Sequence, residues 1–299
     1  MKNNNKINTL LLILIAAILG GAAGVFGKIA LKEIPSFSFT FLRFLIASVF
    51  LIPFSLKHLP TFKKKDYKII LLSLLASVNV VLFSFGIKYT TANISQMIYT
   101  AVPIVSAVLS FYLFGERFNF KKILGILIGF IGTITIILLP IISNNNLGSI
   151  KGNIIISIAM SSISLYWVLS KKFQSEYSPL KINNYFIFIT TILLFFLSFY
   201  DLIKTPNWYD HISIRAYLAL IFIAIFSTAI TYLLNQVLIK RTTPVLASMV
   251  LYLQPFTTFI WAYIFLSEKL SLPFLVGAIL TLIGIGIYNF SKKTSDTQL

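Results

Sequence analysis

The sequence predicts an all-α integral membrane protein of ten transmembrane helices, arranged as two inverted five-helix repeats around a central cavity. Of its 299 residues, 58% are apolar and only 11% are charged, which is too apolar for a soluble globule. Ten segments are apolar over the roughly 20 residues that a helix needs to cross a bilayer. Residues 88–132 also recur as residues 240–284, at a constant offset of 152. A duplicated apolar chain is typical of transporters built from two like halves.

The expected spans follow one another with short connections, so we expect no attached soluble domain. They are residues 9–31, 36–56, 69–87, 91–114, 123–142, 153–169, 182–200, 216–238, 244–266 and 272–290. A polar stretch at residues 143–151 separates one repeat, expected at residues 1–142, from a second at residues 152–299. Because five is an odd number, the second repeat must enter the membrane in the opposite direction.

The recurrence rests on identical residues at the constant offset. Lys88, Thr90, Thr91, Met97, Pro103, Glu116, Gly125 and Gly132 match Lys240, Thr242, Thr243, Met249, Pro255, Glu268, Gly277 and Gly284. Glycines spaced along one helix face predict where helices approach each other closely. Two such stripes stand out, Gly20, Gly24 and Gly27 in the first span and Gly125, Gly129 and Gly132 in the fifth.

Lys and Arg side chains are unevenly divided between the predicted loops. With a cytoplasmic N-terminus, seventeen of the 25 face the cytoplasm, seven face the other side, and Arg43 lies within the second span. This bias predicts a multi-pass protein of the plasma or inner membrane with both termini in the cytoplasm. It accounts for the net charge of +17 without a nucleic acid partner. As an alternative, Lys2, Lys6 and the apolar run after them fit a cleaved signal peptide, which would leave nine helices.

The sequence resembles the drug/metabolite transporter superfamily, and most closely its EamA-type members. The resemblance rests on the duplicated ten-helix plan, the context Phe41-Leu-Arg-Phe-Leu-Ile-Ala, and the turns Gly115-Glu116-Arg117 and Ser267-Glu268-Lys269. It implies a basket of helices whose cavity is lined mainly by the first, third, fourth, sixth, eighth and ninth helices. Many bacterial members export amino acids or related metabolites, but the superfamily also handles nucleotide-linked sugars, cofactors and drugs. The resemblance therefore implies transport without naming a substrate.

Polar and aromatic side chains within the apolar spans are the candidates for the cavity wall, because polar groups are costly in lipid. The candidates are Asn79, Phe83, Gln96, Tyr99, Thr100, Tyr166, Trp167, Thr231, Asn235, Gln236, Ser248 and Tyr252. For Tyr166 and Trp167 the alternative is the aromatic belt at the membrane surface. Pro103 and Pro255 each remove a helical hydrogen bond near mid-membrane and free a carbonyl for substrate binding or bending, with a plain kink as the alternative.

Three charged residues are expected to act structurally. Arg43 is the one charge well inside a span, and it either binds a substrate carboxylate or pairs locally to hold the second helix in place. We favour the local pairing, because the second helix is expected to be peripheral and an arginine in lipid can be relieved locally. Glu116 and Glu268 end helices on opposite sides of the membrane and are expected to anchor their hairpins on a neighbouring helix N-terminus or a cation.

The remaining chemistry argues against catalysis and against proton antiport. All eight acidic residues and both histidines fall in predicted loops, turns or helix ends, so no base or proton carrier lies in mid-membrane. The chain has no cysteine, and we expect neither a metal nor a cofactor. We expect an alternating-access exporter of small neutral or zwitterionic, amino-acid-like metabolites, with a flippase of lipid-linked sugars or headgroups as the alternative. The expected partners are the substrate and the lipid bilayer, and the chain acts as a monomer or homodimer.

Overall fold

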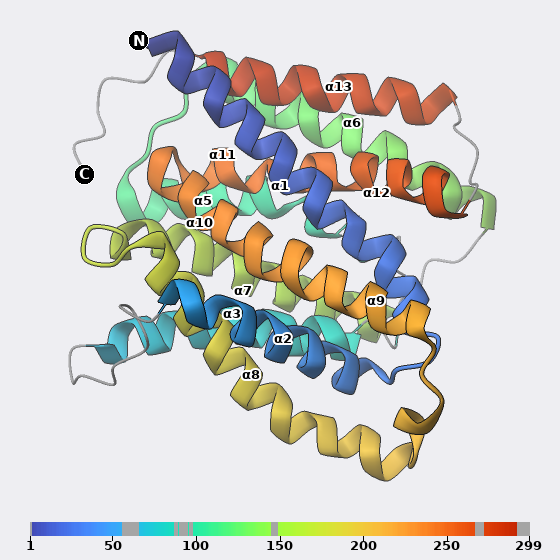
Figure 1. Ribbon diagram of the computed structural model, residues 1–299. Coiled ribbons are helices and arrows are strands. Elements are labelled where there is room, and N and C mark those ends of the chain that lie inside the picture. Colours follow the sequence, from blue (N-terminus) through green and yellow to red (C-terminus); the bar gives the residue numbers. More distant parts are fainter. Residues whose placement is uncertain are drawn as a thin grey trace.

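The computed structural model describes residues 2–55, 66–86, 89, 95, 98–144, 149–266 and 272–291. Over these residues the chain is helical, with no strand, and its helices account for all ten predicted spans (Figure 1). The first five spans correspond to α1 (Lys2–Ala30), α2 (Ser36–Ser55), α3 (Tyr67–Gly86), α5 (Val102–Phe114) and α6 (Phe120–Asn144). The last five are α7 (Ile150–Phe173), α8 (Pro179–Lys204), α9 (Ile214–Phe222) with η3 (Ile223–Ile230) and α10 (Thr231–Arg241), α11 (Pro244–Ser248) with α12 (Val250–Leu266), and α13 (Leu272–Phe290). The predicted fold class is confirmed.

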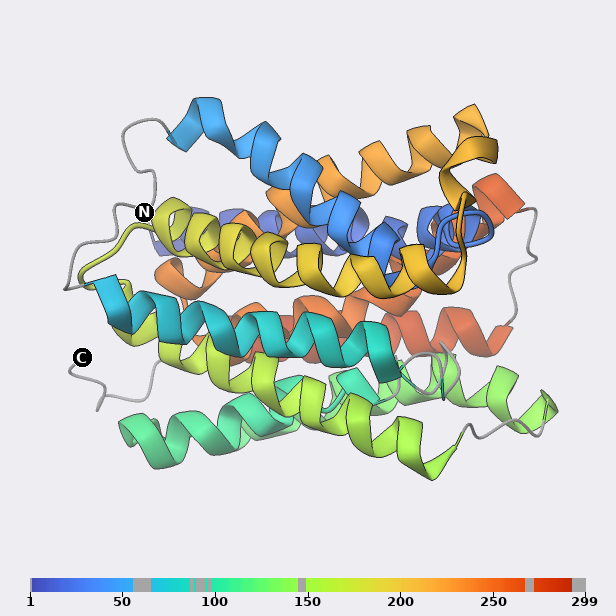
Figure 2. The ribbon, with the colours of Figure 1, turned by 90° about the horizontal axis from the view of Figure 1, so that it is seen from below.

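The helices of the first five spans pack against those of the last five in a two-fold pattern. Two pairs join a helix to its own counterpart, α6 to α13 and α2 to α8, and α5 packs against α11, which belongs to the counterpart ninth span. The other major contacts come in matched couples. The contact of α3 with α7 is matched in the other repeat by the contact of α9, η3 and α10 with α1. Likewise, the contact of α1 with α12 is matched by that of α7 with α5. Figure 2 shows α3 lying between α8 and α7. Each five-helix repeat is therefore completed by the other, with the core between them.

The contact between α6 and α13 shows that the repeats are inverted. A Cβ added to Gly125 would lie 2.8 Å from the carbonyl oxygen of Gly284, and one added to Gly132 would lie 2.7 Å from that of Gly277. From the first contact to the second, the residue number rises in α6 (125 to 132) and falls in α13 (284 to 277), so these equivalent helices are antiparallel. The glycine stripe in the fifth span is confirmed as a close helix contact.

The glycine stripe in α1 is confirmed in part. A Cβ on Gly20 would lie 2.5 Å from Nε2 of Gln254, and one on Gly24 would lie 2.7 Å from Cγ2 of Thr258. These two glycines therefore let α12 approach α1 closely. Gly27 does not belong to this contact, since its nearest neighbour would be Ile223 at an ordinary 3.9 Å.

Two spans that the sequence predicts as continuous helices are interrupted. The eighth contains the π-helical segment η3, in which Thr228 Oγ1 donates to the carbonyl of Ile223 (3.0 Å), five residues earlier. The ninth begins as α11 and continues as α12 after Met249. Segments of π-helix occur frequently at functional sites, and η3 lies next to the cavity described below.

At both ends of the bundle, a carboxylate accepts hydrogen bonds that join separate helices. At the end that holds the α1–α2 connection, Asp201 Oδ2 accepts from the backbone amides of Phe37 and Ser38, both at 2.8 Å. These amides lie at the start of α2, where a helix has free N–H groups and favours negative charge. At the opposite end, Asp66 accepts from the hydroxyls of Tyr177 (3.2 Å) and Tyr185 (2.9 Å). The first turns of α1 and the end of α13 lie at that same end (Figure 1).

Candidate functional site

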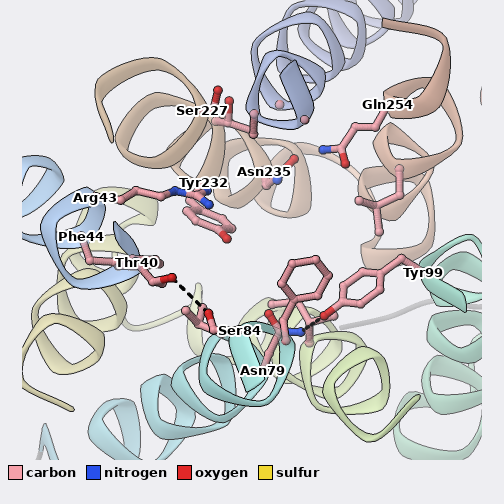
Figure 3. A pocket seen from close by; sticks show the side chains of 18 of the residues that line it. Thr40, Arg43, Phe44, Asn79, Ser84, Tyr99, Ser227, Tyr232, Asn235 and Gln254 are labelled. Carbon is pink, nitrogen blue, oxygen red and sulfur yellow. Dashed lines mark hydrogen bonds between the residues drawn. The ribbon is translucent and has the colours of Figure 1, made fainter. Parts of the chain in front are cut away.

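A cavity of about 240 Å³ lies between the two repeats. Its wall comes from α1, α2, α3, Tyr99 just before α5, α7, η3, α10 and α12 (Figure 3). These include the helices that the family resemblance implies, and α2 is added to them. The cavity reaches Leu31 and Ser36 at the α1–α2 connection, and Leu31 is exposed.

Half of the twelve predicted wall residues line this cavity. They are Asn79, Phe83, Tyr99, Trp167, Thr231 and Asn235. Asn79 and Thr231 are counterparts at the offset of 152, as are Phe83 and Asn235, so α3 and α10 present equivalent positions to the same space. Such a two-fold arrangement is typical of binding sites at the interface of inverted repeats.

The polar groups of α3 are held in defined positions. Asn79 Nδ2 donates to the hydroxyl of Tyr99 and to the carbonyl of Ala159 (2.8 Å). The ring of Tyr99 meets that of Phe83 edge-on, with centroids 5.4 Å apart. Thr40 of α2 and Ser84 of α3 share a hydrogen bond of 3.1 Å (Figure 3). One wall of the cavity therefore carries an amide, three hydroxyls and two aromatic rings in a fixed arrangement.

Five predicted wall residues do not line the cavity, and the structure shows why for four of them. Tyr166 and Gln236 are buried against each other, since Gln236 Nε2 donates to the hydroxyl of Tyr166 (3.0 Å). Ser248 Oγ turns back to the carbonyl of Val245 (2.7 Å). The ring of Tyr252 packs against Gly129, where an added Cβ would lie 2.6 Å from Cδ2 of Tyr252.

The fifth of these residues, Thr100, is buried in the turn before α5. Gln96, the remaining predicted wall residue, lies outside the described residues, as does Glu268. Tyr166 and Trp167 are both buried, so neither belongs to an aromatic belt at the membrane surface.

The two prolines differ in their positions. Pro103 lies in the first turn of α5, where a missing N–H costs little, so it marks the start of a helix and not a break within one. Pro255 lies inside α12 and cannot donate to the carbonyl of Leu251, a residue of the cavity wall. The expected free carbonyl near the cavity therefore fits Pro255 alone.

Several wall residues were not among the predicted set. They include Phe39, Thr40, Phe44, Ser84, Ser227, Tyr232 and Gln254. Three of these come from α2, which the sequence analysis treats as peripheral. The sequence signal for α2 is spacing relative to Arg43. Thr40 precedes Arg43 by three residues and so shares its helix face, and Phe44 follows it directly.

Arg43 lies on the cavity wall. Its Nε donates to Oγ1 of Thr228 in η3, and its Cζ lies 5.8 Å from the ring centroid of Phe44. Figure 3 shows the guanidinium beside Tyr232. Within the described part of the chain, no carboxylate forms an ion pair with Arg43, and the cavity wall includes no Asp or Glu. The wall therefore carries one positive charge with no acidic partner among these residues.

Glu116 is buried away from the cavity, between α5 and α6. Its burial raises the pKa of this carboxyl, and the charges of Lys122 and Lys171 partly offset that rise. Lys171 also donates through Nζ to the carbonyls of Ile239 (2.9 Å) and Thr242 (2.8 Å) at the end of α10. This setting supports the expected anchoring role of Glu116 beside cations. Among the described residues, no three His, Cys, Asp or Glu side chains gather into a metal-binding group.

Comparison with known proteins gives consistent results. The family model described as the EamA-like transporter family matches residues 7–138 and again residues 150–290. The protein named "Uncharacterized transporter YetK" from Bacillus subtilis (strain 168) is 27% identical over 92% of this chain and 85% of its own length. The "Uncharacterized transporter in trpA 3'region" of Buchnera aphidicola subsp. Schlechtendalia chinensis is 29% identical over 95% of each chain. One crystal structure, 17% identical, has the same fold, with a TM-score of 0.78 over 94% of this chain and 96% of the other.

Proposed function

The chain belongs to the EamA-like transporter family, and on that premise we propose that it exports small neutral or zwitterionic, amino-acid-like metabolites by alternating access. The observation that carries the proposal is the cavity of about 240 Å³ between the two inverted repeats. Pockets for drug-sized ligands are typically about 300–1,000 Å³, so this one suits a smaller molecule. Aromatic rings and neutral polar groups dominate its wall, which favours a ligand with both an apolar part and hydrogen-bonding groups.

Alternating access is supported by the difference between the two ends of the bundle. The cavity reaches the end that holds the α1–α2 connection, at Leu31 and Ser36. Toward the other end, Tyr166, Gln236 and Gln174 are buried and bonded to one another. A transporter must close one end while the other is open. With the termini in the cytoplasm, as the distribution of Lys and Arg predicts, this conformation faces outward.

A flippase would need a cavity that admits a large headgroup while its lipid tail stays in the bilayer. The small volume and the aromatic wall, with Phe39, Phe83 and Trp167 among its residues, favour a soluble metabolite instead. We therefore retain the metabolite exporter as the proposed function.

The proposal is tested by growth of cells that overproduce the chain on a panel of toxic amino-acid analogues. Resistance to at least one analogue is expected, and Asn79→Ala and Asn235→Ala should abolish it at normal membrane levels. Ser161→Ala is the matched control, since Ser161 lies on the exposed face of α7 and bonds only within its own helix. Two results would contradict the proposal: sensitivity of the overproducing cells to every analogue, or resistance in both cavity variants equal to that of the wild type.

A further inference from the structure

The electrostatics of the cavity are unbalanced. Arg43 brings a full positive charge to a wall made otherwise of neutral side chains. A cation in a space with little water is costly unless an anion or several hydrogen-bond acceptors face it. The hydroxyls of Thr228 and Tyr232 supply acceptors, but within the described residues no carboxylate supplies the opposite charge. A ligand that brings a negative group would remove this imbalance.

The attachment of Arg43 leaves most of its donors for a ligand. A guanidinium has five N–H donors in a planar fork; Nε is committed to Thr228, and the hydroxyl of Tyr232 takes one further side-chain hydrogen bond. Thr228 uses its own proton on the carbonyl of Ile223 (3.0 Å), so its oxygen is fixed as an acceptor by the π-helical turn. Figure 3 shows the rest of the guanidinium beside Tyr232, at the edge of the cavity. Two parallel N–H groups of an arginine match the two oxygens of a carboxylate.

A second, independent group in the wall lacks a partner. Asn235 is only 4% exposed, and its Oδ1 has no hydrogen-bond partner. Figure 3 shows its side chain turned toward the cavity, one helical turn along α10 from Tyr232. A buried carbonyl oxygen without a donor is costly, so a native structure that keeps one calls for an explanation. An ammonium group of a ligand would satisfy it.

We infer that Arg43 binds the carboxylate of the substrate and that Oδ1 of Asn235 accepts a hydrogen bond from its ammonium group. The substrate class is then an α-amino acid or close analogue with a free carboxylate. Its side chain lies among the rings of Phe44, Phe83 and Trp167. This inference deepens the proposed function and rests on it. It also assigns Arg43 to binding, whereas the sequence alone favours a structural role.

The inference predicts that binding depends on both charged groups of the ligand, on the carboxylate through Arg43 and on the ammonium through Asn235. Binding of the twenty standard amino acids to the purified protein in nanodiscs identifies which free acids bind. For each of these, the amide and the methyl ester lack the carboxylate and keep the ammonium, while the N-acetyl derivative does the reverse. The wild-type protein should bind amides and esters about tenfold or more weakly than free acids.

Arg43→Gln should abolish this preference by weakening the free acid to the level of its ester, with the ester itself unchanged. Arg43→Lys keeps the charge without the fork and should fall between the two. Asn235→Leu should reduce the penalty for N-acetylation and leave the preference for the free carboxylate in place. A purely structural Arg43 would instead weaken all ligands alike.

The outcomes separate the inference from the proposed function. If the wild-type protein binds esters as tightly as free acids, the carboxylate site is wrong while the exporter proposal stands. If Arg43→Lys and Arg43→Gln both keep the full preference for free acids, the assignment to Arg43 is wrong. If no free acid and no derivative binds, the proposed function fails together with the inference. The ligand comparison on the wild-type protein decides the first point even if an Arg43 variant does not fold.

Discussion

The side-chain amide of Gln236 donates a hydrogen bond of 3.0 Å to the hydroxyl of Tyr166, and both residues are almost fully buried. Gln174 extends this pair, since its Nε2 donates to the backbone carbonyl (2.8 Å) and to Oε1 (2.9 Å) of Gln236. The three side chains join α7 to α10 on the side of the cavity opposite the α1–α2 connection. On the proposed alternating-access mechanism, these side chains close this end of the cavity.

Weakening this closure should open the cavity from the end that holds the termini. Gln174→Ala removes two hydrogen bonds from the cluster, and each is worth about 1 kcal/mol. The chain contains no cysteine, so Thr231→Cys provides a single reporter on the cavity wall. In membrane vesicles that expose the termini, an impermeant thiol reagent should modify this reporter several-fold faster when Gln174→Ala is also present. Ser175→Ala, in the same loop but exposed, is the control, and equal rates in the two double variants would contradict the closure.

The glycine contact between the repeats gives a prediction with a control in the same helix. Gly284→Ala would place a methyl group 2.4 Å from the backbone nitrogen of Gly129 and 2.7 Å from the carbonyl oxygen of Gly125. Backbone atoms cannot yield as a flexible side chain does, so we expect a loss of about 1–3 kcal/mol in stability. Gly286→Ala meets nothing within 4 Å and should be neutral. Thermal unfolding in detergent measures both, and equal stability of the two variants would argue against the close packing of α6 on α13.

Asp66 gives a prediction for pH dependence. Burial by itself raises the pKa of this carboxyl, but the hydroxyls of Tyr185 and Tyr177 and the charge of Lys181 outweigh it, so the pKa lies below its usual value. Lys181 Nζ lies 3.6 Å from Oδ1 of Asp66. A lowered folded-state pKa stabilises the fold above the unfolded value of about 3.9, and this contribution is lost as the pH falls from there through the folded-state value.

Asp66→Asn should therefore lower the free energy of unfolding by about 2 kcal/mol at pH 7, as expected for hydrogen bonds to a charged group. The difference between the variant and the wild-type protein should shrink as the pH falls below about 4. Asp210→Asn, at an exposed aspartate, is the control and should change little. A difference between wild type and Asp66→Asn that grows on acidification would show that the sign of this pKa shift is wrong.

The sequence predicts the fold well because its two strongest signals are independent of side-chain detail. Apolar runs locate the spans, and the recurrence at residues 88–132 and 240–284 requires two like halves. Asn79 and Asn235, polar residues for which no hydrogen bond within their own helix is seen, lie on the cavity wall, where the sequence analysis expects them. For these, the cost of exposing a polar group to lipid determines the direction of the side chain.

The sequence cannot show which polar groups satisfy each other across helices. In the sequence, Tyr166 and Gln236 resemble cavity residues. In the structure they bond to each other, and neither lies on the cavity wall. The π-helical segment Ile223–Ile230 is apolar apart from two hydroxyls and has no local signal that distinguishes it from an α-helix. Because η3 places Thr228 against Arg43, the position of that charge on the cavity wall also depends on a tertiary contact.

The central claim is that the cavity between the inverted repeats carries small zwitterionic metabolites across the bilayer. Counterflow of amino acids into liposomes that contain the purified protein tests it most directly. Saturable exchange of at least one amino acid is expected, lowered about tenfold or more by Asn79→Ala and by Asn235→Ala and unchanged by Ser161→Ala. No exchange of any amino acid, or equal exchange in all three variants, would contradict the claim.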